Sequence, residues 1–165
     1  MVEITLPIVL QIIQTISLAV GIFYYLTIMR NQQRSNNLYT LQQRVQTMDR
    51  SHWQAWANVL QIKYETTDEW VEKYNVNANP EVFADWCYIG SLYHNVGFLL
   101  KHNLVDPDTV FELYPPGSIL RVWRRYETVV DRTNEVIGGN LWQYFKYLKG
   151  EAERKFPELE LPDDY

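Results

Sequence analysis

The sequence predicts an all-α protein, in which an N-terminal transmembrane helix continues into a helical stalk and then a cytoplasmic bundle of about five helices. An apolar run over residues 6–29 contains no charged side chain. No Gly or Pro occurs over residues 22–79, so long helix is the default there. No stretch shows the strict apolar and polar alternation of a half-buried strand.

The apolar run is long enough to cross a membrane. At about 1.5 Å per residue, a helix over residues 6–29 spans roughly 36 Å, against a hydrocarbon core of about 30 Å. Pro7 falls at its start, where a helix tolerates proline. A buried core helix and a cleaved signal peptide are the alternatives. The length and lack of charge disfavour the first, and the missing basic n-region disfavours the second.

Charges flanking the run predict its orientation. Arg30, Arg34 and Arg44 form a basic juxtamembrane collar, and no Lys or Arg precedes the run. The positive-inside rule then places the N-terminus outside the plasma membrane and the following domain in the cytoplasm. The collar is also placed to touch anionic headgroups of the bilayer.

Composition narrows the class of protein. Aromatic residues make up 15% of the 165 residues, which predicts a packed domain rather than a disordered one. The net charge is −5, and a basic collar before an acidic domain is not the profile of a nucleic-acid-binding protein. Cys87 is the single cysteine, so no intrachain disulfide can form, as is typical of a reducing cytosol.

The stalk carries a heptad-like pattern that runs on into the domain. Ser51 and Gln54 form a capping box within it, which predicts a break over residues 49–51 and a second helix after it. The pattern is compatible with packing inside one chain and with self-association as a coiled coil. Its apolar or small positions are Leu38, Leu41, Val45, Met48, His52, Ala55, Val59 and Ile62.

The central helices of the bundle have clear start signals. Thr66 and Glu69 predict a cap for a short helix over residues 66–74. Asn79 followed by Pro80 predicts the start of a helix reaching about residue 102. Gly90 and Gly97 lie seven residues apart on one side of that helix, which predicts close approach of another helix.

The C-terminal third predicts three more helices and a tail. Asp106 opens a short helix reaching about residue 114, and Ser118 caps one over about residues 119–137. Asn140 caps the last helix. The predicted organisation is therefore an N-terminus with a membrane span (1–29), a stalk (30–50), a helical bundle (51–155) and an acidic, flexible tail (156–165).

These segments together resemble a known family. The apolar span with its Arg collar and four later groups of residues are similar to a family of archaeal and bacterial single-pass membrane proteins whose domain has no assigned function. The resemblance implies an anchored helical domain and transfers no catalytic residue. Its later groups are Phe83 with Ile89-Gly90, Leu104-Val105-Asp106-Pro107 with Val110, Trp123-Arg124-Arg125-Tyr126 with Arg132, and Tyr144-Phe145 with Leu148.

One candidate contact surface lies within the span. Gln14, Ser17 and Gly21 share a helix face, and Ser17 with Gly21 is a small-xxx-small pair of the kind that allows helices to approach in lipid. The alternative is a lone anchor with incidental small residues. The face predicts self-association or contact with another membrane protein.

One basic helix is the candidate anion site. Guanidinium groups grip phosphate and carboxylate, but acids share this helix, so a solvated, ion-paired face is the competing interpretation. The arginines are Arg121, Arg124, Arg125 and Arg132.

Catalytic and metal chemistry has no clear signal. His52, His94 and His102 lack the spacing of a helical metal site, and Cys87 lies on a predicted helix interior. No nucleophile elbow, P-loop or dinucleotide fingerprint occurs. We therefore expect a non-enzymatic interaction module without cofactor or metal, tethered to the membrane as an adaptor or an accessory subunit. A membrane-tethered domain that senses an anion or other ligand is the alternative.

Overall fold

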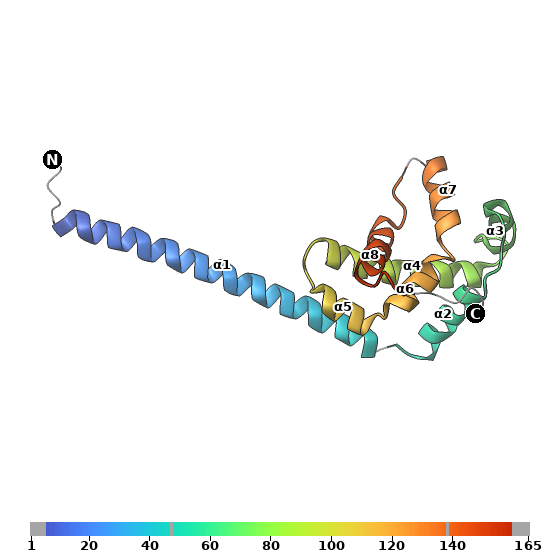
Figure 1. Cartoon of the computed structure of the whole chain (residues 1–165), viewed down its shortest axis with the longest axis horizontal. Coiled ribbons are helices and arrows are strands. Elements are labelled where there is room, and N and C mark those ends of the chain that lie inside the picture. The colour runs from blue at the N-terminus through green and yellow to red at the C-terminus, as the bar shows by residue number, and fades with distance from the viewer. Residues whose placement is uncertain (1–5, 47, 138, 160–165) are drawn as a thin grey trace.

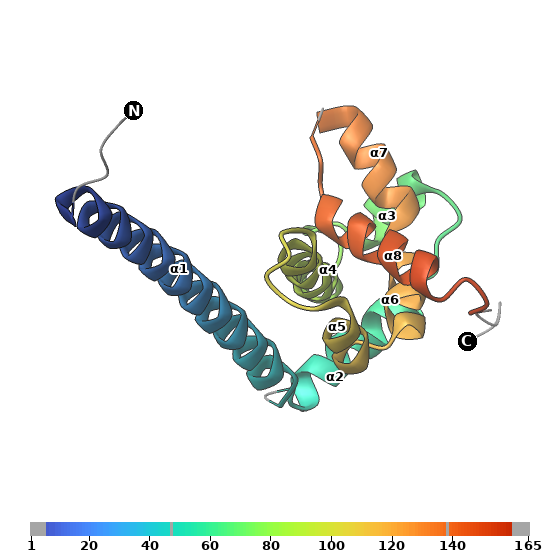
Figure 2. The same cartoon turned by 60° about the vertical axis from the view of Figure 1, so that its left-hand side comes forward.

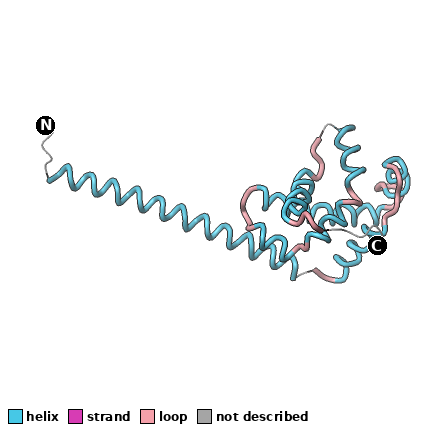
Figure 3. The backbone as a smooth tube through the Cα atoms, in the orientation of Figure 1, coloured by secondary structure: helices cyan, strands magenta, loops and turns pink. Residues whose placement is uncertain are grey.

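The computed structural model describes residues 6–46, 48–137 and 139–159, and these residues form helices without any strand (Figures 1 and 3). The all-α prediction is confirmed. Seven helices follow the first one in these residues, against the five or so expected, in part because the single helix expected over residues 119–137 is divided in two. The helices are α1 (Leu6–Gln46), α2 (Arg50–Gln61), α3 (Thr67–Tyr74), α4 (Pro80–Lys101), α5 (Pro107–Leu113), α6 (Pro116–Trp123), α7 (Glu127–Ile137) and α8 (Gln143–Lys155).

Helix α1 projects from the folded domain like a rod. Two views show its N-terminal half reaching away from the other helices and only its C-terminal part beside them (Figures 1 and 2). Its 41 residues correspond to about 61 Å of helix. Near its end Leu41 is 1% exposed and belongs to the core, and Asn37 Nδ2 donates to Leu104 O at 3.3 Å. The domain therefore holds the stalk through side chains on its last turns.

The predicted break after the stalk is present, but its cap differs from the expected one. Helix α2 is capped by Asp49, whose carboxylate accepts from the backbone N–H of His52 at 3.1 Å. Ser51 lies inside the helix and donates its hydroxyl to the same carboxylate at 2.6 Å. The prediction of a Ser51–Gln54 capping box was therefore wrong. The heptad positions of α2 are buried within this one chain: His52, Ala55 and Val59.

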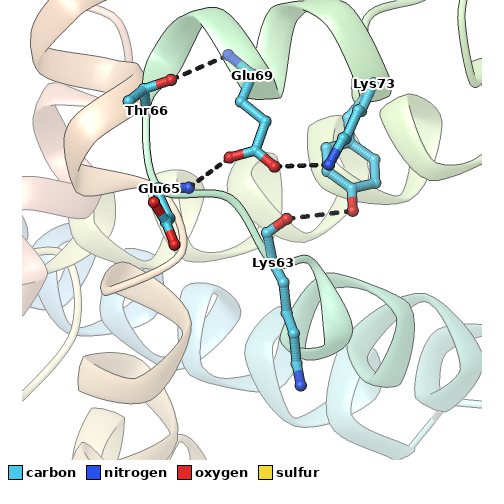
Figure 4. A network of polar contacts seen from close by, with 6 residues as sticks. Lys63, Glu65, Thr66, Glu69 and Lys73 are labelled. Carbon is cyan, nitrogen blue, oxygen red and sulfur yellow. Dashed lines mark hydrogen bonds and ion pairs between the residues drawn. The ribbon is translucent and has the colours of Figure 1, made fainter.

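Helix α3 begins with the cap that the sequence predicts. Thr66 Oγ1 accepts from the Glu69 backbone at 3.2 Å, and the Glu69 carboxylate returns to the Glu65 N–H at 2.8 Å (Figure 4). The other carboxylate oxygen of Glu69 accepts from Lys73 at 2.6 Å. This network fixes the entry to α3 with side chains that lie within nine residues of one another.

Helix α4 is the centre of the domain. Asn79 caps it, with its side chain accepting from Val82 N at 3.2 Å, and Pro80 opens it as predicted. Figure 2 shows α4 nearly end-on, with α8 and α5 beside it. Trp86 stacks on Tyr126 with ring centroids 4.6 Å apart, and the Tyr126 hydroxyl donates to Trp86 O at 2.6 Å. This buried pair ties α4 to the segment between α6 and α7.

That segment explains why one predicted helix is two. The expected helix over residues 119–137 is interrupted at residues 124–126, between α6 and α7. The Arg125 and Tyr126 N–H groups turn to carbonyls three residues back, and Tyr126 is fully buried. Helix α6 also begins at Pro116 after Pro115, without the side-chain cap expected from Ser118. Gly138, part of the predicted end of α7, lies outside the described residues.

The C-terminal part shows two further differences. Asn140 does not cap the last helix: α8 starts at Gln143, after Trp142 in the left-handed region with φ 56°. The carbonyl of Asn140 accepts from Gln143 instead. At the start of the predicted tail, Phe156 packs edge-to-face on Phe111, with the ring centroids 5.5 Å apart. The tail therefore begins in contact with the domain. The rest of the predicted tail, residues 160–165, lies outside the described residues.

Candidate functional site

The N-terminal half of α1 exposes an apolar surface. The helix is long and apolar enough to span a membrane, and none of its apolar window is buried against the rest of the chain. Two of its hydroxyl groups are satisfied within the helix, because Thr15 donates its hydroxyl to Gln11 O at 2.9 Å and Thr27 donates to Phe23 O at 2.8 Å. The residues of this surface that are more than half exposed include Leu10, Ile12, Ile13, Ile16, Leu18, Val20, Ile22, Phe23, Tyr24, Tyr25 and Leu26.

The predicted contact face of the span is open. Gln14, Ser17 and Gly21 are exposed on α1. A Cβ added at Gly21 would meet no atom within 4 Å. The face is therefore free to meet another helix.

The basic collar begins where the apolar surface ends. Arg30 and Arg34 are exposed on α1, while the Arg44 side chain lies outside the described residues. Neither Arg30 nor Arg34 takes part in the ion pairs that the described residues form. Their guanidinium groups are thus available to groups outside this chain.

A cleft lies between the collar and the domain. It measures about 420 Å³ and is bounded by one turn of α1 and by the loop between α4 and α5 with the start of α5. The Asn37–Leu104 hydrogen bond and the buried Val105 hold the loop against the stalk. Asn103 has φ 54°, a conformation that Asn tolerates at the end of a helix. The lining residues are Arg34, Ser35, Leu38, Asn103, Val105, Asp106, Pro107 and Thr109.

Sequence reasoning missed this cleft. The sequence predicts Arg34 as part of the collar and Asp106 as a helix cap. Asp106 is a cap, because its carboxylate accepts from Thr109 N at 3.1 Å. Arg34 and Asp106 are brought together by the hydrogen bond between Asn37 and Leu104. These two residues lie 67 apart in the chain, and no local sequence pattern encodes their contact. The sequence feature that comes nearest to indicating the cleft is Asn103, which follows the predicted end of a helix at about residue 102.

Gly90 and Gly97 lie where α8 and its preceding segment approach α4. A Cβ at Gly97 would be 1.9 Å from Tyr144 O, and one at Gly90 would be 2.8 Å from Cε1 of Tyr126. Trp142 lies 3.0 Å from the same point at Gly90. No side chain has room at either position, so Gly97 allows α8 to pack on α4, and Gly90 makes room for the rings of Tyr126 and Trp142.

The turn at residues 124–126, between α6 and α7, divides the four arginines of the candidate anion site. Arg121 lies on α6, Arg124 and Arg125 in the turn, and Arg132 on α7. Arg132 pairs with Glu135 at 3.2 Å, with both side chains largely exposed. Exposed pairs of this kind contribute little to stability and present no concentrated positive field.

The Arg124 neighbourhood is mixed in charge. Arg124 lines a shallow hollow of about 300 Å³ together with Glu127, Lys149 and Glu153. Lys149 and Glu153 form an ion pair at 2.9 Å. The arrangement is that of a solvated, ion-paired surface.

The histidines pack against aromatic rings, and His94 and His102 contact the same Tyr144 ring at centroid distances of 5.0 and 5.7 Å. In the part of the chain that the structure describes, no three His, Cys, Asp or Glu side chains gather as a metal site would need. His52 is buried beside Tyr88, with Nδ1 3.2 Å from its hydroxyl, and desolvation lowers the pKa of His52. Desolvation also lowers the pKa of His94 and raises that of the Cys87 thiol. Each group thus favours its neutral form, and a neutral thiol is a poor nucleophile.

Comparison with known proteins gives no relative for this chain. No protein-family model, no curated protein and no solved structure matches it. The resemblance to the single-pass family therefore stays a prediction.

Proposed function

We propose that this chain is a single-pass membrane protein whose helical domain is a non-enzymatic interaction module, an adaptor or an accessory subunit of a membrane complex. The supporting observation is the contrast along α1. Residues 6–29 expose apolar side chains to whatever surrounds them, whereas Leu41 of the same helix is in the core of the domain. An exposed apolar surface of this length needs lipid or protein around it.

The continuous helix gives the module a mechanical role. Helix α1 has no break between its apolar half and the turn held by the domain. A partner that binds the span is therefore linked by rigid helix to the domain surface. The domain side offers helix faces for packing, and the span offers the face of Gln14, Ser17 and Gly21.

The proposed orientation has the domain in the cytoplasm and the short N-terminus outside the plasma membrane. The positive-inside rule supports it, because Arg30 and Arg34 follow the span. Fusing a fluorescent protein or alkaline phosphatase to the C-terminus tests it. Fluorescence without phosphatase activity is the expected result, and phosphatase activity would reverse the topology.

The proposed partner contact is tested by crosslinking in native membranes, followed by co-purification after gentle solubilisation. Gly21→Ile should abolish the crosslinked species, because a branched side chain keeps a second helix from approaching. Ala19→Ile is the matched control, since residue 19 lies on the opposite face of α1. A strictly monomeric chain with no co-purifying protein would contradict the interaction module, and equal crosslinking of both variants would reject this face.

A further inference from the structure

The cleft between α1 and the α4–α5 loop has the position of a lipid-headgroup site. Arg34 follows Met29 by five residues, or about 7.5 Å along a helix. The headgroup layer beyond the hydrocarbon core is about 5 to 8 Å thick. The Cα–Cβ bonds of a helix tilt toward its N-terminus, which for α1 is the side of the apolar half. If residues 6–29 span the membrane, this cleft therefore opens at the level of the headgroups.

The walls of the cleft carry both signs of charge. Arg34 comes from the stalk and Asp106 from the loop side, and neither takes part in the ion pairs of the described residues. The Asp106 carboxylate has two oxygens, and one accepts the cap bond from Thr109 N. The remaining capacity of that carboxylate is free for a cationic donor.

The cleft also offers neutral hydrogen-bonding groups and is held in shape. Ser35, Asn103 and Thr109 line it together with Arg34, and their side chains carry hydroxyl or amide groups. The Asn37 side chain of α1 donates a hydrogen bond to Leu104 O in the loop, and this bond fixes the spacing of the two walls. A ligand with one anionic and one cationic group would meet a partner for each.

We propose that this cleft binds the headgroup of a phospholipid that bears a primary ammonium group, with the phosphate on Arg34 and the ammonium on Asp106. The inference rests on the proposed membrane anchoring. Guanidinium binds phosphate through paired N–H donors, and a primary ammonium can donate to a carboxylate. A quaternary ammonium has no N–H to donate, and an uncharged alcohol headgroup leaves Asp106 without a cation.

Native mass spectrometry of the full chain in detergent tests the proposal. The protein is offered equal amounts of phosphatidylethanolamine, phosphatidylcholine and phosphatidylglycerol with identical acyl chains, so that only the headgroups differ. We expect phosphatidylethanolamine adducts to exceed the other two by up to about fivefold, the range of a single exposed ion pair. Equal adducts, or a preference for phosphatidylglycerol, would overturn the assignment.

Matched variants locate the effect. Asp106→Asn keeps a good helix cap and removes the charge, so it should lower the phosphatidylethanolamine adducts to the level of phosphatidylcholine. Asp108→Asn makes the same change two residues away, where the carboxylate pairs with Lys155, and should keep the preference. Arg34→Ala should lower the adducts of all three lipids, because each carries the phosphate, while Arg30→Ala should keep the preference for phosphatidylethanolamine. Loss of preference in both controls would assign the effect to overall charge and overturn the site.

Two further readouts separate the sources of failure. Soluble phosphoethanolamine at the same concentration as the lipid should leave the adduct in place, and displacement would overturn the lipid as the occupant. Retention of the chain in membranes is scored separately. A chain that stays in the membrane but shows equal adducts rejects the headgroup site alone, whereas a chain released from the membrane rejects the anchor as well.

Discussion

Gly21 and Gly97 are both glycines inside long helices, yet their surroundings are opposite. Around Gly21 there is no atom within 4 Å of an added Cβ, whereas at Gly97 the backbone of Tyr144 fills that position. Gly97 lies where the chain has already packed two of its own helices. Gly21 lies in the half of α1 whose apolar window is not buried against any other part of the chain that the structure describes. Gly97 thus reflects a contact already made within the chain, whereas Gly21 leaves room for a contact that lipid or another protein must supply.

The largest expected effect comes from truncating the buried end of α1. Leu41→Ala should destabilise the domain by about 2 to 5 kcal/mol, because Leu41 is fully buried and a cavity replaces its side chain. Chemical denaturation in detergent, followed by Trp fluorescence, measures this, since every Trp lies in the domain. Leu26→Ala, at a position that is 54% exposed in the apolar half, is the control and should leave the midpoint unchanged. Equal effects of both variants would erase the contrast between the two halves.

A smaller loss is expected at the helix crossing. Gly97→Ala should cost about 1 to 3 kcal/mol, because the added methyl group overlaps the Tyr144 carbonyl. Gly150→Ala, in a helix position with nothing within 4 Å, should be neutral or stabilising by up to about 1 kcal/mol. The same denaturation experiment compares them. A Gly97→Ala protein as stable as the wild type would contradict the close approach of α8.

Removing one buried hydroxyl should cost less. Tyr126→Phe loses the hydrogen bond to Trp86 O and should lower stability by about 1 kcal/mol. Tyr25→Phe in the exposed half of α1 should leave the unfolding of the domain unchanged. If the two substitutions have the same effect, the buried bond does not hold the turn at residues 124–126.

The smallest effect is on pH dependence. Desolvation lowers the pKa of His52 and His94 in the folded chain, so the unfolded chain takes up protons first as the pH falls. The two histidines therefore make their full contribution to the free energy of unfolding above the ordinary pKa of about 6.5. This contribution is lost as the pH falls from there toward the lowered pKa of the folded chain. The urea midpoint should decrease from pH 7.5 to pH 5.5, and His52→Gln should reduce the slope. An unchanged slope would show that His52 charges equally in both states.

Local sequence signals predicted some of the contacts between neighbouring residues, and they missed the contacts between distant residues. The caps at Thr66 and Asn79 follow from residues three apart and are present. The first cap of the domain was assigned to Ser51 instead of Asp49, because two good cap residues stand two positions apart and only the backbone angles decide between them.

The division between α6 and α7 could not be predicted, because no Gly or Pro marks it. Burial of Tyr126 against Trp86, forty residues earlier, favours the turn. The cleft has the same origin, in a contact between Asn37 and Leu104. The candidate contact face of the span was readable in the sequence, since spacing on a single helix is a local property.

The most direct test of the account is the behaviour of the full chain in native membranes washed with alkaline carbonate. Carbonate strips proteins held at the surface and leaves those whose helix crosses the hydrocarbon core. The exposed apolar half of α1 predicts that the chain stays in the membrane pellet until detergent is added. Recovery of the chain in the carbonate supernatant would contradict the membrane span on which the proposed function rests.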